Sequence, residues 1–143
     1  MARRIARPIH LVIAWLLVAG LLVQVFLAGM GVFDSSSVFA THRDFGYTLT
    51  LLPVVLLVTS LVGGFGRMEA IAAAVMFGQF ILQSVFVLQR DSNPAIAALH
   101  PVNGFLILLI AVWLARDAWR QLRVTEDEGD PAAEAAPSES TPG

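Results

Sequence analysis

Four long apolar segments, separated by short polar ones, make up most of the chain. They cover residues 9–33, 45–63, 69–88 and 98–115. A helix needs roughly 20 residues to cross a bilayer core of about 30 Å, and each segment is near that length. The pattern therefore predicts an all-α fold, an integral membrane four-helix bundle whose helices run up, down, up and down.

The polar flanks divide the chain into three parts. Residues 1–8 form a basic N-terminus, residues 9–123 hold the four spans, and residues 124–143 are acidic and rich in Pro, Glu, Ser and Ala. Because the last part lacks apolar periodicity, we expect a disordered tail. Pro53 and Pro101 are expected to kink the second and fourth spans.

Arginines are distributed unevenly over the two ends of the spans. One end carries Arg3, Arg4, Arg7, Arg67, Arg116, Arg120 and Arg123. The other end has only Arg43 and Arg90, each beside an aspartate. The positive-inside rule then places both termini in the cytoplasm. Because every cation is arginine and alanine is abundant, we expect a multi-pass protein of the inner (cytoplasmic) membrane of a GC-rich bacterium.

Composition agrees with a membrane protein and limits its chemistry. The chain is 57% hydrophobic and 14% charged, and its mean hydropathy is +0.73. It has no cysteine, which excludes disulfides, thiolate metal sites and cysteine nucleophiles. The lipid bilayer is the expected partner, a redox partner or a second copy stays open, and nucleic acid is not expected.

Two matched segments carry the candidate chemistry. His42 precedes Gly46 by four residues, and His100 precedes Gly104 by four; an aromatic residue follows each glycine. Residues i and i+4 share one face of a helix, so each imidazole would lie above a gap where no side chain stands. A flat ligand fits such a gap.

Polar residues of the other two spans lie at a similar depth. At 1.5 Å per residue, Gln24 lies about 22 Å and Gln83 about 21 Å from the cytoplasmic end of its span, and His100 about 24 Å. The first and third spans also align at Leu-Gln, and the second and fourth at the histidine segments. Two helical hairpins related by an axis along the membrane normal would place His42 and His100 symmetrically.

These residues predict a haem site. Neutral imidazole is a common axial ligand of haem iron, and two histidines of a four-helix bundle can hold one macrocycle. We therefore expect one b-type haem near the outer face, with its iron bound by His42 and His100. Gly46 and Gly104 would let the porphyrin approach the backbone. Gln24 and Gln83 would bond a propionate or orient a ligand.

Other interpretations stay open. A histidine at a helix start can simply cap the helix or meet headgroups, so the rival class is a cofactor-free membrane protein that acts as an assembly or interaction subunit. A bound transition metal would lack a third strong ligand, for which Asp44 is the candidate. His10 follows the N-terminal arginines without a glycine partner, and we expect it to pack at the cytoplasmic interface.

The histidine segments resemble those of the haem A synthase family. Its eight-helix members consist of two four-helix bundles, whose second and fourth helices carry haem-binding histidines at the outer face. Thr41-His42-Arg43 is similar to the start of a ligand helix there, and residues 24–33 resemble a Gln-x-x-Leu-Gly segment. The chain also resembles small uncharacterised four-helix membrane families of GC-rich bacteria.

The departures from the haem A synthase pattern concern catalysis. That family has a glutamate shortly before the His-Arg pair, whereas residues 38–41 here are Val-Phe-Ala-Thr, and the cysteine pair of many members is absent. The resemblance therefore implies haem binding for electron transfer or haem handling. It does not imply haem hydroxylation or another complete enzyme reaction by this chain alone.

Overall fold

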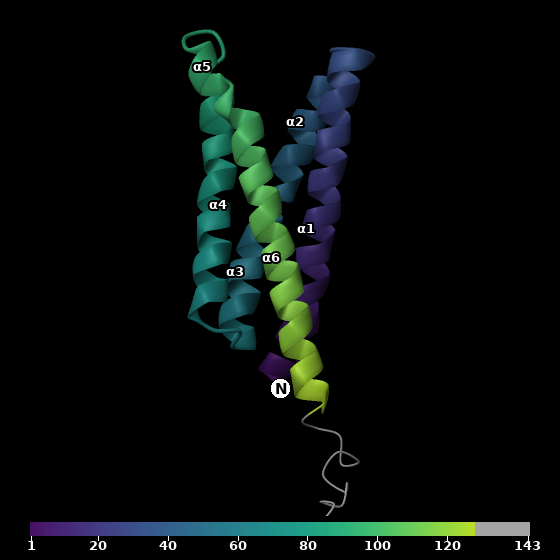
Figure 1. The fold of residues 1–143 in the computed structure, drawn as a ribbon, viewed down its shortest axis with the longest axis vertical. Coiled ribbons are helices and arrows are strands. Elements are labelled where there is room, and N and C mark those ends of the chain that lie inside the picture. Colours follow the sequence, from purple (N-terminus) through teal and green to yellow (C-terminus); the bar gives the residue numbers. More distant parts are fainter. Residues whose placement is uncertain (128–143) are drawn as a thin grey trace, which may run out of the picture.

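A computed structural model describes residues 1–127, with side chains through residue 124, and these residues form helices joined by short turns. The elements are α1 (Ala2–Phe33), α2 (Val38–Leu49), α3 (Leu51–Gly63), α4 (Arg67–Leu88), α5 (Pro94–Ala97) and α6 (Leu99–Asp127). Four helical stretches are long and apolar enough to cross a membrane, with α2 and α3 forming one of them. The predicted all-α four-helix membrane bundle is confirmed (Figure 1). The predicted acidic tail lies, from residue 128 onward, outside the described residues.

The break between α2 and α3 has a local cause in Pro53. Proline has no N–H, and its ring clashes with the carbonyl four residues before it, here that of Leu49. Helix α2 ends at that residue. The Thr50 hydroxyl then donates to the Gly46 carbonyl oxygen at 3.2 Å, so the interrupted helix keeps this acceptor satisfied.

Tight turns connect the spans. Between α3 and α4, Gly64 has φ +65° and Gly66 has φ +106°, conformations that favour glycine. Between α4 and α6, the Asn93 side chain accepts a hydrogen bond from the Ile96 N–H, and Pro94 begins α5. This N-cap followed by proline at N1 is the arrangement typical of a helix start.

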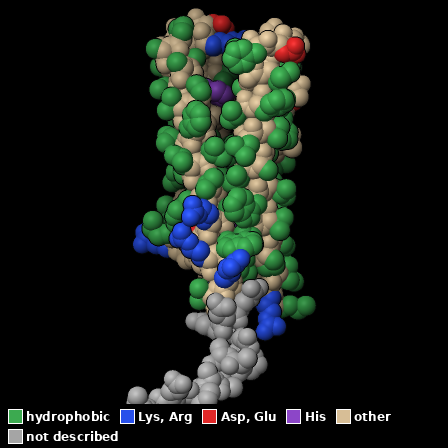
Figure 2. All heavy atoms as spheres, turned by 45° about the vertical axis from the view of Figure 1, so that its right-hand side comes forward, with side chains coloured by type: hydrophobic (Ala, Val, Ile, Leu, Met, Phe, Trp, Pro, Cys, Tyr) green, Lys and Arg blue, Asp and Glu red, His purple; other side chains and the backbone are tan. Residues whose placement is uncertain are grey.

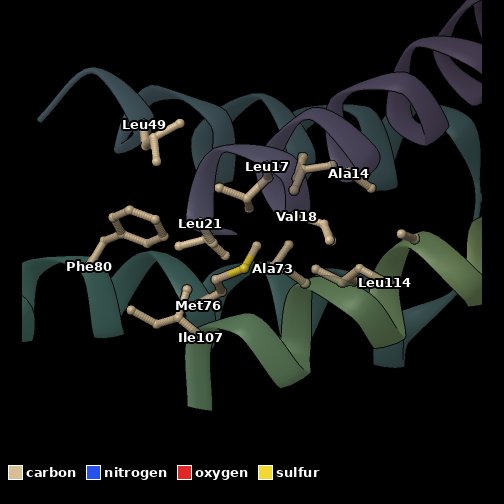
Figure 3. Packing of buried hydrophobic residues seen from close by; sticks show 13 residues of the cluster. Ala14, Leu17, Val18, Leu21, Leu49, Ala73, Met76, Phe80, Ile107 and Leu114 are labelled. Carbon is tan, nitrogen blue, oxygen red and sulfur yellow. The ribbon is translucent and has the colours of Figure 1, made fainter. Parts of the chain in front are cut away.

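The four spans pack around a dry centre. α1 contacts α3 and α6 extensively, α4 contacts the same two helices, and α2 packs on α1. The centre is filled by side chains with no exposed surface or almost none, among them Leu17, Leu56, Met76, Ile107 and Leu114 (Figure 3).

The core also carries the internal repeat. Adding 59 to a residue number of α1 gives the corresponding residue of α4, as for Gln24 and Gln83 (83 − 24 = 59). Adding 58 to a residue number of α2 or α3 gives the corresponding residue of α6, as for His42 and His100 (100 − 42 = 58). The buried pairs related in this way are Ala14 and Ala73, Leu17 and Met76, Leu21 and Phe80, Leu49 and Ile107, and Leu56 and Leu114. Two hairpins of the same design therefore build one core.

Small residues set how closely the helices approach. Ala111, Ala115 and Ala118 of α6 have no exposed surface. In lipid, helices associate through close packing, which small side chains allow. The α6 helix thus meets its neighbours along a stripe of alanines.

Ala115→Leu should destabilise the bundle. The added side chain has no space to enter, and overpacking typically costs about 1–3 kcal/mol. The matched control is Ala74→Leu on the exposed face of α4, which should leave stability unchanged. Unfolding by denaturing detergent, followed by circular dichroism, compares the two variants; equal effects would contradict the packing described here.

Candidate histidine site

Six polar residues gather at the end of the bundle where α1 approaches α2 and α4 approaches α6. We call this group the histidine layer: Gln24, His42, Gln79, Gln83, His100 and Asn103. Each of the four spans contributes at least one member. The contacts between these side chains agree with the prediction that Gln24, Gln83 and His100 lie at a similar depth in the membrane.

His42 and Gln24 bond each other in both directions. The His42 Nδ1–H donates to the Gln24 carbonyl oxygen at 3.0 Å, because a carbonyl has no hydrogen to give. The Gln24 side-chain Nε2 donates in return to the His42 carbonyl oxygen at 2.9 Å. This pair of bonds fixes the imidazole of α2 against α1.

His100 is held in the equivalent way by α4. Its Nδ1–H donates to the Gln83 carbonyl oxygen at 3.3 Å. The buried Asn103, one turn further along α6, donates from Nδ2 to the Gln79 carbonyl oxygen at 2.9 Å and to Gln83 Oε1 at 3.0 Å. Each histidine Nδ1–H thus donates to the backbone carbonyl oxygen of a glutamine, on α1 for His42 and on α4 for His100.

The imidazole rings face each other across the bundle. Their centroids are 6.1 Å apart and their planes are inclined at 67°. With Nδ1 protonated in each neutral ring, Nε2 carries the lone pair that a metal ligand needs. Roughly 2 Å from each nitrogen to a shared metal, plus about 1 Å from each nitrogen to its ring centre, gives centroids about 6 Å apart.

The space above the glycines differs from the expectation. A Cβ added to Gly46 would lie 2.6 Å from Gln24 Nε2, and one added to Gly104 would lie 3.3 Å from Gln83 Nε2. The side-chain amides of Gln24 and Gln83 occupy the space beside Gly46 and Gly104, respectively. From there each amide reaches its hydrogen-bond partner on the neighbouring helix. The two glycines therefore make room for glutamine side chains, and no flat ligand lies directly above them in this arrangement.

The layer is open to the surroundings. Both histidines are half-buried, and Figure 2 shows a histidine side chain at the bottom of an opening between two columns of helices. Two buried acceptors in the layer, Gln24 Oε1 and Gln79 Oε1, have no hydrogen-bond partner. Buried polar atoms are nearly always paired, so these two oxygens indicate room for a further donor such as ordered water.

Asp44, the candidate third metal ligand, lies elsewhere. It is exposed and pairs with its neighbour Arg43 at 2.8 Å. Within residues 1–124, no group of three or more His, Cys, Asp or Glu side chains is arranged to hold a metal ion. The two histidines are the ligand set that the layer offers.

A second polar cluster, which the sequence analysis missed, lies at the opposite end of the spans. His10 has no exposed surface there: its Nδ1 lies 2.9 Å from Thr59 Oγ1 and its Nε2 lies 3.1 Å from Glu69 Oε1. Packing at the membrane interface, expected for His10, is wrong, because the side chain points into the bundle to reach these two partners.

The internal repeat contains the signal for this cluster. The shift that maps Gln24 onto Gln83 also maps His10 onto Glu69, 59 residues later. The shift that maps His42 onto His100 also maps Thr59 onto Asp117. Since symmetric residues near an axis face each other, the repeat predicts the His10–Glu69 contact.

Residues 24–89 match the model of a family of unknown function (DUF6220). The matched segment holds Gln24, His42 and Gln83 of the histidine layer, together with Glu69. No curated protein matches the chain, and no solved structure matches it.

Asn103→Leu should destabilise the histidine layer. The change leaves Gln83 Oε1 without its donor, and a hydrogen bond of this kind contributes about 1 kcal/mol. In the double variant Gln83→Leu, Asn103→Leu both partners are apolar, so the loss should be smaller than the sum of the two single losses. Additive losses, measured by unfolding in detergent, would show that the bond contributes nothing.

Proposed function

We propose that the chain binds one b-type haem between His42 and His100 and serves in electron transfer or haem handling. The observation that carries the proposal is the pair of imidazoles 6.1 Å apart, each with Nδ1 fixed on a backbone carbonyl. That separation suits a single metal held by both Nε2 atoms. The resemblance of the histidine segments to those of the haem A synthase family supports the same ligand pair.

The residues of the layer have distinct tasks in this proposal. The carbonyl oxygens of Gln24 and Gln83 select the tautomer that presents Nε2, and they stop the rings from rotating. Asn103 holds the Gln83 amide in turn. Below the layer, the buried Leu49 and Phe80 supply an apolar surface of the kind that a porphyrin edge packs against.

A bound haem would supply reversible one-electron chemistry at its iron. With His42 and His100 both holding the iron, no coordination position would be left open for a substrate, which would favour electron transfer over reaction at the metal. No carboxylate stands within residues 38–41, and Asp44 is exposed and paired with Arg43. The chain therefore lacks a buried acid beside His42 for haem hydroxylation, and we propose no enzymatic reaction for it alone.

The proposed location follows from the arginines. Seven of the nine, all except Arg43 and Arg90, lie at the end of the bundle opposite the histidine layer, where Figure 2 shows a group of blue side chains. Because the positive-inside rule favours arginines on the cytoplasmic side, we propose that both termini lie in the cytoplasm of a bacterium and that the haem lies near the outer face of its inner membrane. The exposed apolar surface of all four spans faces the lipid.

Absorption spectroscopy of the detergent-purified protein with haem supplied tests the proposal. We expect a Soret band of six-coordinate, low-spin haem b at one haem per chain. His42→Gly and His100→Gly should each lose that spectrum, since only one axial ligand is left, and added imidazole should restore it. The matched histidine control, His10→Gln, should keep the wild-type spectrum.

Two outcomes would count against the haem. One is the absence of a Soret band in folded protein, and the other is a spectrum that neither histidine variant changes. In either case the layer would serve to join helices, as in a cofactor-free assembly or interaction subunit.

A further inference from the structure

The cluster of His10, Thr59, Glu69 and Asp117, which we call the acidic cluster, joins four helices at the end of the bundle that carries the arginines. His10 and Glu69 have 0% and 1% exposed side-chain surface. Asp117 of α6 is near enough for its charge to act on Glu69. Ionisable side chains inside a membrane bundle are costly and usually have a function.

The donors in this cluster can be assigned. Thr59 Oγ1 lies 2.7 Å from the Val55 carbonyl oxygen, so its one hydrogen is used there. The contact between Thr59 Oγ1 and His10 Nδ1 must then be donated by Nδ1–H. The remaining ring nitrogen, Nε2, shares one proton with Glu69 Oε1, whichever atom carries it.

One atom of the cluster is left without a partner. Glu69 Oε2 is buried and has no hydrogen-bond partner among the described residues. A buried carboxylate oxygen without a donor is unfavourable, and the negative charge of Asp117, which acts on the same carboxylate, makes it more so. A proton bound to Oε2 would convert this lone acceptor into a donor.

Access to the cluster is from one side. Towards the histidine layer, the cluster is closed by Ala14, Leu56, Ala73 and Leu114, which have no exposed surface. Towards the arginine end, Asp117 is half-buried and accepts a hydrogen bond from Gln121 at 2.6 Å. Asp117, the partly exposed carboxylate of the cluster, therefore lies on the side of the arginine end.

The helices packed around the cluster carry further charged residues. Arg7 of α1 lies over the Phe65 ring, with its Cζ 5.4 Å from the ring centroid, and the same ring lies 4.5 Å from the His10 ring, centroid to centroid. On α4, Glu69 itself stands in the first turn, where the helix dipole favours negative charge. On α6 the charged neighbour is Asp117, and α3 contributes only the hydroxyls of Thr59 and Ser60.

We propose that the acidic cluster is a proton-binding site, in which one exchangeable proton is shared by Glu69 and Asp117 and taken up from the arginine end. On uptake, one proton from water binds the carboxylate pair, forming one carboxylic acid and lowering the net negative charge of the cluster by one. On release the proton returns to water. His10 keeps its own protons and orients Glu69 throughout. The proposal does not rest on the haem.

Infrared difference spectroscopy over a pH series, with the full chain in lipid nanodiscs, tests the site. We expect a carboxylic acid C=O band that changes with pH and shifts when the sample is transferred to D₂O. Glu69→Gln should remove the band, because the amide imitates the protonated acid without titrating. Asp117→Asn removes the neighbouring negative charge and should weaken proton binding about tenfold.

The matched control is Asp91→Asn, an exposed aspartate at the other end of the bundle, which should leave the band unchanged. A band that persists in Glu69→Gln, or no band that responds to pH, would overturn the proposal. A carboxylic acid band that stays constant over the pH series would do so as well, because it would mark a fixed structural hydrogen bond. Should Glu69→Gln fail to fold, Asp117→Asn decides instead: a band whose pH response is the same as in the wild type would overturn the proposal.

Discussion

The absence of water from the bilayer core governs this structure. A polar group placed there must find its partner within the protein, because no solvent can supply one. Among the described residues, the buried polar side chains of the spans gather in two places, the histidine layer and the acidic cluster. Between them lies only packed hydrocarbon, with Leu17, Met76 and Leu114 at its centre.

The apolar core separates two ends of the bundle that are packed differently. At the arginine end, α3 is packed on α1 and α4, and alanines let α6 approach closely. At the histidine end, α2 packs on α1 while α6 packs on α4, and the space-filling view shows an opening between the two columns of helices there (Figure 2). The proposed haem would bind at this divided end.

The sequence predicts local features well, because each has a nearby cause. The four spans follow from apolar length, the break in the second span follows from Pro53, and the common depth of Gln24, Gln83 and His100 follows from the helical rise. What the glutamine side chains do is harder to foresee. Whether Gln24 fills the gap above Gly46 depends on how closely α1 and α2 approach, which no single segment determines.

The contact between His10 and Glu69 is an example of a long-range contact that the local sequence around either residue does not predict. Judged by its neighbours, it stands beside arginines at a membrane interface. Its partner Glu69 is 59 residues away and stands at the very start of a span, where an acid is unremarkable. Only the repeat relates the two positions, and it does so with the same shift that aligns the glutamines of the histidine layer.

The histidine layer and the acidic cluster differ in how closely their residues follow the internal repeat. At the two histidines the symmetric positions hold identical residues, His42 with His100, Gln24 with Gln83 and Gly46 with Gly104, whereas Gln79 and Asn103 of the layer correspond to Gly20 and Phe45. Identical ligands on an axis suit a bound group with two equivalent faces, and the iron of a haem has two equivalent axial positions.

In the acidic cluster the symmetric positions differ, with His10 opposite Glu69 and Thr59 opposite Asp117. Two glutamates at the positions of His10 and Glu69 would place two like charges in contact at a buried site, which is unstable. His10 instead gives Glu69 a hydrogen-bond partner, and the exchangeable proton of the proposal allows the second acid, Asp117, to lie near Glu69.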